Sequence, residues 1–149
     1  MARRELARAV LRTSGLALML ASAIHLIATP EIPHLLDGLS PEARGFAVGP
    51  MLLDHVLVGI LLLPLGFTTW FAATGYYLNE TWARPILIVN SLAAFALPFS
   101  LVLFMGRPEY DRTPLFLASV VLTVLAAVSI PIAALIGAAG AVGVKSRPL

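Results

Sequence analysis

Residues 113–144 read TPLFLASVVLTVLAAVSIPIAALIGAAGAVGV, a run that contains no Asp, Glu, Lys or Arg. Three further stretches, 13–30, 56–79 and 85–106, also lack these four residue types. A helix needs roughly 20 apolar residues to cross the hydrocarbon core of a bilayer. Each stretch is near or above this length, although the first needs its basic flank to complete a span. The sequence therefore predicts an all-α integral membrane protein with four transmembrane helices.

The composition supports the same class. Of the 149 residues, 59% are hydrophobic and only 12% are charged, whereas a soluble domain carries roughly 25% charged residues. A chain of this length cannot bury so much apolar surface against itself, because small domains leave much of their surface exposed. The chain has no cysteine, which excludes a disulfide framework, a thiolate metal site and a cysteine nucleophile.

Proline positions help to place the spans. Pro50, Pro85 and Pro114 each precede an apolar stretch, where proline suits the first turn of a helix because its missing N–H costs no hydrogen bond there. We expect one domain, 1–149, with spans at about 11–29, 51–78, 85–105 and 114–140. These spans would form an antiparallel bundle, with a short amphipathic helix in the loop between the first two.

Basic residues set the expected orientation. Seven of them fall on the side of the two chain ends, and three fall on the other side: Arg44, Arg107 and Arg112. The seven are Arg3, Arg4, Arg8, Arg12, Arg84, Lys145 and Arg147. The positive-inside rule then puts both termini in the cytoplasm. The layout resembles the broad class of small bacterial four-span proteins, in architecture only, and that implies a multi-pass protein of the bacterial cell inner membrane.

The N-terminus also permits another interpretation. A basic start, an apolar middle and the triplet Ala21-Ser22-Ala23 together have the pattern of a cleaved signal peptide. Cleavage there would remove most of the first helix. N-terminal sequencing of the mature protein separates the two interpretations.

Histidine and carboxylate residues gather on the predicted outer side. His25 lies about one turn before Pro30, and His55 lies about one turn after Pro50, so the two imidazoles are expected at similar depth at the outer ends of the first two helices. Between them, Glu31, His34 and Asp37 recur every three residues and would share one face of a helix lying along the interface. Six of the eight acidic residues fall on this side: Glu31, Asp37, Glu42, Asp54, Glu109 and Asp111.

Three chemistries suit this cluster. Imidazole and carboxylate ligands favour zinc, copper or iron, and the candidate metal ligands are His25, His34, Asp54, His55 and Glu31. Alternatively, His25 and His55 are cofactor ligands that hold haem b through its two axial positions. The third chemistry is proton handling, because imidazole titrates in the useful range. The plain alternative is that these groups make structural hydrogen bonds only.

Enzyme and nucleic-acid signals are weak. A serine nucleophile needs a base and an orienting group, and Ser40 is the only serine expected near the outer cluster. Whether the chain is an enzyme stays open. No basic face with interleaved aromatic residues points to nucleic acid as a partner.

Several residues within the spans suggest how the helices pack. Pro64, Pro98 and Pro131 interrupt apolar runs and predict either packing kinks or a loosened cavity. Asn90 is expected to hydrogen-bond to another helix. Small residues crowd the fourth span and would allow close approach, within the bundle or to a partner: Ala126, Ala127, Ala133, Ala134, Gly137, Ala138 and Gly140.

Size, the absence of a large extramembrane domain and the stripe of small residues favour one role. We expect a non-catalytic subunit or partner-binding component of a larger membrane assembly, in contact with the bilayer and with other subunits or copies of itself. The alternatives are a metal- or haem-binding redox or transport protein that uses the outer cluster, and a small proton or ion transporter that works as an oligomer.

Overall fold

The structure is a computed structural model that describes residues 2–105 and 114–142. Its elements are α1 (Ala2–Ala28), η1 (Thr29–Glu31), α2 (Ile32–Leu35), α3 (Pro41–Tyr77), α4 (Ala83–Met105) and α5 (Pro114–Val142). Within these residues the regular structure is entirely helical, and four helices are long and apolar enough to cross a membrane. The predictions of an all-α fold and a multi-pass membrane protein are confirmed. Arg107, Glu109, Asp111, Arg112, Lys145 and Arg147 lie outside the described residues.

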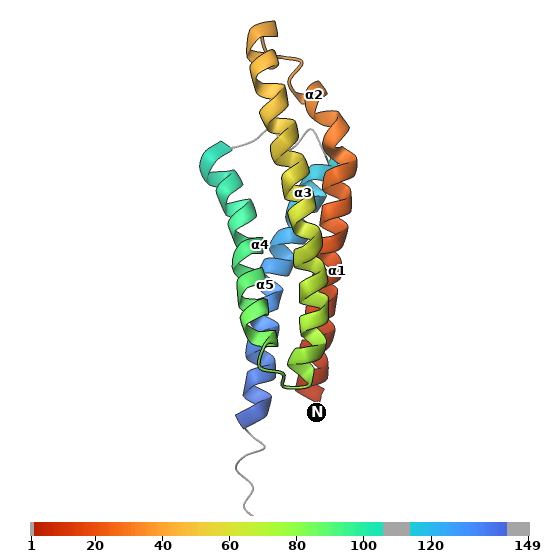
Figure 1. Ribbon diagram of the computed structural model, residues 1–149, viewed down its shortest axis with the longest axis vertical. Coiled ribbons are helices and arrows are strands. Elements are labelled where there is room, and N and C mark those ends of the chain that lie inside the picture. Colours follow the sequence, from red (N-terminus) through yellow and green to blue (C-terminus); the bar gives the residue numbers. More distant parts are fainter. Residues whose placement is uncertain (1, 106–113, 143–149) are drawn as a thin grey trace, which may run out of the picture.

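The four long helices lie side by side (Figure 1). α1 runs from the N-terminal end of the molecule, and η1 and α2 connect it to α3, which runs back to the same end. α1 packs most extensively against α3 and α5, whereas α4 packs on α3 and α5. The first helix of the chain is therefore central to the structure, and α4 is the outermost.

The connection between the first two long helices differs from the prediction. α3 does not begin at Pro50 but at Pro41, where the Ser40 hydroxyl accepts a hydrogen bond from the Ala43 N–H and caps the helix. Pro50 stands inside α3. Its ring removes the hydrogen bond to the carbonyl of Phe46, but the helix is exposed there, so solvent can satisfy that carbonyl. The expected amphipathic loop helix is reduced to η1 and the single turn of α2.

α1 and α3 approach most closely at two glycines. A Cβ atom on Gly15 would lie 2.8 Å from the Gly66 carbonyl oxygen, and one on Gly66 would lie 2.7 Å from the Gly15 carbonyl oxygen. Backbone therefore meets backbone at this crossing, which only glycine permits. Leu11 and Leu18 of α1 are fully buried on either side of it.

The stripe of small residues on α5 packs inside the bundle. Ala126, Ala127 and Ala133 are buried in the core cluster, and Gly137 makes room for the ring of Tyr76. These residues serve contacts within the chain, so they do not provide a free docking face. The burial of Ala138 and Gly140 is not described.

Polar side chains join the helices as expected for Asn90. Its amide nitrogen donates to the Thr68 and Thr69 hydroxyls of α3, at 2.8 and 2.9 Å. Ser91 donates to the Ala127 carbonyl oxygen of α5 at 3.1 Å. The prediction that Asn90 bonds to a neighbouring helix is confirmed. Pro64, Pro98 and Pro131 lie inside α3, α4 and α5, which continue through them.

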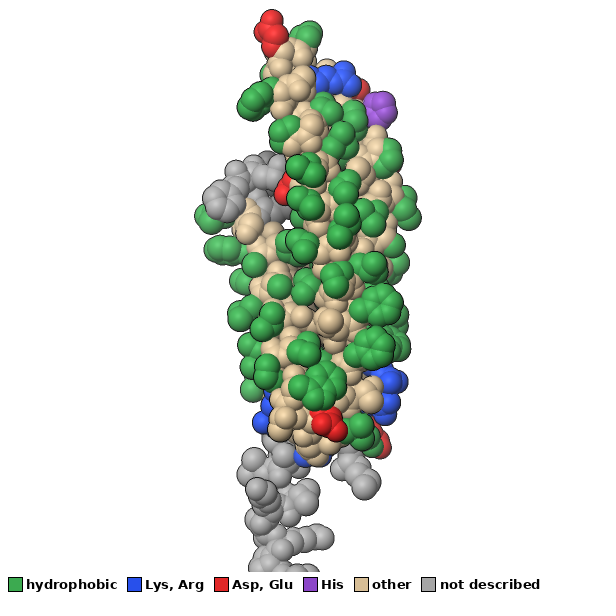
Figure 2. All heavy atoms as spheres, viewed as in Figure 1, with side chains coloured by type: hydrophobic (Ala, Val, Ile, Leu, Met, Phe, Trp, Pro, Cys, Tyr) green, Lys and Arg blue, Asp and Glu red, His purple; other side chains and the backbone are tan. Residues whose placement is uncertain are grey.

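Figure 2 shows how side-chain types are distributed along the molecule. Hydrophobic side chains cover its middle, while the charged side chains of the described residues gather towards the two ends. Large apolar residues around this belt are half or more exposed, among them Phe71, Leu92 and Phe95. Such a surface is stable against lipid rather than water.

Candidate functional site

Two histidines from different helices lie face to face towards the end of the bundle opposite the N-terminus. The ring centroids of His25 on α1 and His55 on α3 are 3.6 Å apart, with 19° between the ring planes. Both residues are buried, with 4% and 5% of their surface exposed. The structure thus brings together the two histidines that the sequence placed at similar depth.

A third helix contributes a hydroxyl to this pair. Ser119 of α5 lies with its Oγ 3.2 Å from Nδ1 of His25 and donates to the Ala21 carbonyl oxygen at 3.1 Å. The Ser119 hydroxyl thus lies within hydrogen-bonding distance of both the imidazole and the backbone of α1. It fixes the position of the His25 ring relative to α5.

Further hydrogen bonds hold the surrounding backbone. Ser22 donates to the Gly59 carbonyl oxygen at 2.7 Å and joins α1 to α3 next to the histidine pair. Thr123 donates to the Ser119 carbonyl oxygen at 2.9 Å within α5. The two imidazoles are thus positioned by α1 and by the two helices that pack most extensively on it, α3 and α5.

The sequence did not predict the part played by Ser119, since Ser40 was the only serine expected near the cluster. That expectation was wrong. Ser119 follows Pro114 by little more than one turn, as His55 follows Pro50. Counting turns from each proline would have placed the serine at a similar depth, but only packing decides that it faces His25.

The other predicted ligands are exposed, unlike this buried pair. His34 is largely exposed and lies 3.6 Å from Asp37, which also pairs with Arg44 at 2.7 Å. Glu31 and Asp54 are exposed. Within residues 2–105 and 114–142, no three His, Asp or Glu side chains are grouped so that they could hold a metal ion. The five-residue metal set is therefore not assembled among the described residues.

The stacking limits what the two imidazoles can do together. An imidazole binds a metal along the lone pair in its ring plane, and these two planes are nearly parallel, so the lone pairs do not converge on one point within them. A haem with two axial histidines needs the macrocycle between the rings, and 3.6 Å between centroids leaves no room for it. A metal on one or both rings remains a prediction. For both rings to bind the same ion, at least one of them would have to rotate.

The Ser119–His25 contact also differs from that of a serine nucleophile. Such a serine gives its proton to the imidazole and has a carboxylate behind the base. Here the hydroxyl donates to a backbone carbonyl. The arrangement is suited to holding an imidazole still.

Comparison with known protein families, curated proteins and solved structures finds no match for this chain. The functions proposed below therefore depend on the residues of this chain alone.

Proposed function

We propose that this protein is a non-catalytic subunit of a larger membrane assembly that binds its partner through an outer arm, residues 29–49. The arm consists of η1, α2, the following turn and the first turns of α3. The observation that carries the proposal is that this arm projects beyond the apolar part of the molecule with a large apolar side chain exposed on it.

The length of α3 supports this. It has 37 residues, which at about 1.5 Å per residue is roughly 55 Å, whereas the hydrocarbon core is about 30 Å thick. The uncharged stretch of α3 begins only at Val56. The residues before Val56 therefore extend the helix by roughly 20 Å. In Figure 1, α3 begins well beyond the nearby ends of α4 and α5.

Phe46 is the exposed apolar side chain of the arm. It is 85% exposed, more than any other large hydrophobic side chain among the described residues. It stands about 15 Å beyond the start of the uncharged stretch at 1.5 Å per residue, so the hydrocarbon core does not cover it. Aromatic residues are enriched at protein interfaces, and an exposed apolar residue at this height is better covered by protein than by water.

The base of the arm is ordered. Arg44 of α3 pairs with Asp37 at 2.7 Å and donates to the Pro33 carbonyl oxygen at 3.3 Å. These bonds tie the turn after α2 to the first turns of α3. A surface that is already ordered loses less conformational entropy when a partner binds.

The proposal includes an orientation. α1 carries four arginines in its first half and α4 has Arg84 as its second residue, and both helices begin at the end of the molecule opposite the arm (Figure 1). By the positive-inside rule this end would face the cytoplasm. The chain would then cross the inner membrane of a bacterium four times as an antiparallel bundle, with both termini in the cytoplasm and the arm outside.

The test is isolation in a mild detergent after expression at native level. We expect wild-type protein in a stoichiometric particle larger than one chain, and Phe46→Asp in a smaller one with the same helix content and melting temperature. Phe46→Tyr, which keeps the aromatic ring, should retain the larger particle. A wild-type protein that runs as a single chain, or a Phe46→Asp variant with unchanged assembly, would overturn the proposal. A particle that contains only this chain would identify the partner as a second copy.

A second candidate function is proton handling by the histidine pair. It is favoured by the burial of two imidazoles, from α1 and α3, beside the Ser119 hydroxyl of α5, because ionisable side chains within membrane spans often belong to proton relays. In liposomes that hold a pH-sensitive dye, wild-type protein should raise the proton flux, and His25→Phe should abolish the increase. Equal flux for both proteins would eliminate this function.

A further inference from the structure

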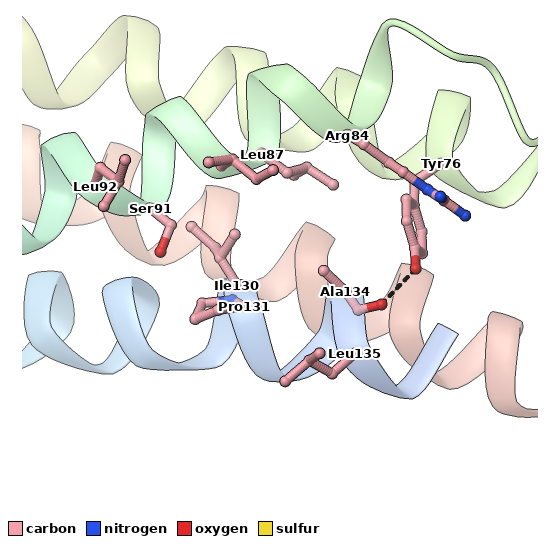
Figure 3. Close-up of a pocket in the computed structure, with 10 residues that line it drawn as sticks. Tyr76, Arg84, Leu87, Ser91, Leu92, Ile130, Pro131, Ala134 and Leu135 are labelled. Atoms are coloured by element: carbon pink, nitrogen blue, oxygen red, sulfur yellow. Dashed lines mark hydrogen bonds between the residues drawn. The ribbon is translucent and has the colours of Figure 1, made fainter. Parts of the chain in front are cut away.

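A groove of about 400 Å³ lies between α4 and α5, away from the histidine pair. Figure 3 shows Leu87 and Leu92 of α4 on one side and Ile130, Pro131 and Leu135 of α5 on the other. Ser91 also lines the groove, but its hydroxyl is already bonded to the Ala127 carbonyl oxygen. The walls are therefore apolar in character, and in a bilayer hydrocarbon fills such a space.

One end of the groove carries a positive charge. Arg84 lies there beside Tyr76 (Figure 3), with its guanidinium carbon 5.9 Å from the centre of the Tyr76 ring. The Tyr76 hydroxyl donates to the Ala134 carbonyl oxygen of α5. A Cβ atom on Gly137 would clash with this ring, so glycine is needed there to seat it. The tyrosine thus closes the groove and supports the arginine.

The charge of Arg84 is available to a ligand. Among the residues that the structure describes, no carboxylate lies within 4.0 Å of its guanidinium. Arg84 is exposed and stands in the first turn of α4, at the end of the molecule where α1 begins (Figure 1). A guanidinium binds phosphate through paired hydrogen bonds.

We propose that this groove binds one anionic phospholipid, with an acyl chain along α4 and α5 and the phosphate on Arg84. Charge complementarity selects the ligand: the groove has one cation at the headgroup level and an apolar channel leading away from it. A protein helix is a poorer fit, because a helix about 10 Å wide fills 400 Å³ with roughly one turn. This proposal does not rest on the partner-binding role of the outer arm.

The first test measures lipid preference. Purified protein is given equal amounts of phosphatidylglycerol and phosphatidylcholine, and bound lipids are counted by native mass spectrometry. Wild type should prefer phosphatidylglycerol about fivefold, as one basic group near a membrane surface supplies. Arg84→Gln should bind both lipids equally, whereas Arg3→Gln, the same charge change on α1 outside the groove, should keep the preference. Equal binding by wild type, or a preference that survives Arg84→Gln, would overturn the proposal.

The second test locates the acyl chain. Phosphatidylglycerol with a photoreactive acyl chain is crosslinked to the wild-type protein, and the adducts are mapped by peptide mass spectrometry. We expect them on groove residues such as Leu92 and Leu135, and expect Arg84→Gln to reduce them to the level of phosphatidylcholine. Adducts spread evenly over lipid-facing residues such as Phe67 and Phe71 of α3 would show only the general lipid annulus and would refute a defined site.

Discussion

At the scale of single residues, the contacts of the histidine pair depend on the direction in which three side chains face. His25 and His55 stack, and Ser119 holds one of the two rings by a hydrogen bond. All three are among the few buried polar residues of the described chain. A buried polar group is costly unless its hydrogen bonds are satisfied, so these contacts stabilise the fold whatever chemistry the pair performs.

Replacing Ser119 with alanine should destabilise the protein. The substitution removes the hydrogen-bond partner of His25 Nδ1 and the donor to the Ala21 carbonyl oxygen, and we expect a loss of about 1 to 3 kcal/mol in unfolding free energy. Thermal unfolding in detergent, followed by circular dichroism, measures this. Ser100→Ala, an exposed serine of α4, is the matched control and should unfold like wild type. Equal stability of all three proteins would show that the Ser119 contacts contribute nothing.

Metal or haem at the histidine pair can be tested directly. If a transition metal binds there, wild-type protein purified without chelator should carry it in stoichiometric amount, and His25→Ala should carry less than a tenth as much, because losing one of two donors removes most of the affinity. Elemental analysis measures the metal, and an absorption spectrum detects haem. The stacked geometry leads us to expect no haem absorption in wild type. A haem band that is lost in His25→Ala would require the rings to separate in the loaded protein.

At the scale of elements, helix starts depend on the chemistry of the first turn. α4 and α5 begin at Ala83 and Pro114, within two residues of the starts that proline predicted. α3 begins at Pro41 instead of near Pro50, because Ser40 and Pro41 together cap a helix at least as well. Two suitable prolines stood in the sequence, and local propensity did not distinguish between them.

The close approach of α1 and α3 leads to a second stability prediction. Gly66→Ala would place a methyl group 2.7 Å from the Gly15 carbonyl oxygen, so the helices must separate, at a cost of about 1 to 3 kcal/mol. The melting temperature in detergent should fall accordingly. Gly45→Ala adds the same methyl group to α3 where nothing lies within 4 Å, and higher helix propensity should make it neutral or more stable by up to about 1 kcal/mol. A Gly66→Ala protein as stable as Gly45→Ala would mean that the crossing is not close.

At the scale of the whole molecule, an apolar belt separates two ends of opposite character. The end where α1 and α4 begin holds the arginines of α1 and Arg84, while the outer arm carries Glu31, Asp37 and Glu42. The two proposals follow this division: we propose a lipid phosphate at the basic end and a protein partner at the arm.

Single cysteines test the proposed orientation, because the natural chain has none. Gly45→Cys on the arm should react with a membrane-impermeant maleimide in intact spheroplasts. Glu80→Cys, in the turn between α3 and α4, should react only after the membrane is permeabilised. Both positions are exposed, so burial in the fold does not limit their reaction. Denatured samples of the two variants should label equally and serve as the control. The reverse pattern would invert the orientation and place the arm in the cytoplasm.

The sequence by itself determined the number of apolar helices, their approximate positions and the nature of the surrounding solvent. Hydropathy is summed along a local stretch of chain, and the thickness of a bilayer sets how long that stretch must be. The interhelical role of Asn90 was also predictable, since a polar amide within an apolar helix has few other ways to satisfy its hydrogen bonds.

The tertiary structure alone decided which helix is central, that His25 and His55 stack, that Ser119 joins them, and that the small residues of α5 face inward. It also placed Arg84 at the end of a groove between two helices. These features depend on how each helix is rotated about its axis and which neighbours it meets. Lipid surrounds apolar helices almost as well as other helices do, so hydropathy does not select which helices meet. Close packing and interhelical hydrogen bonds decide the rotation and the neighbours of each helix, and both join residues far apart in the chain.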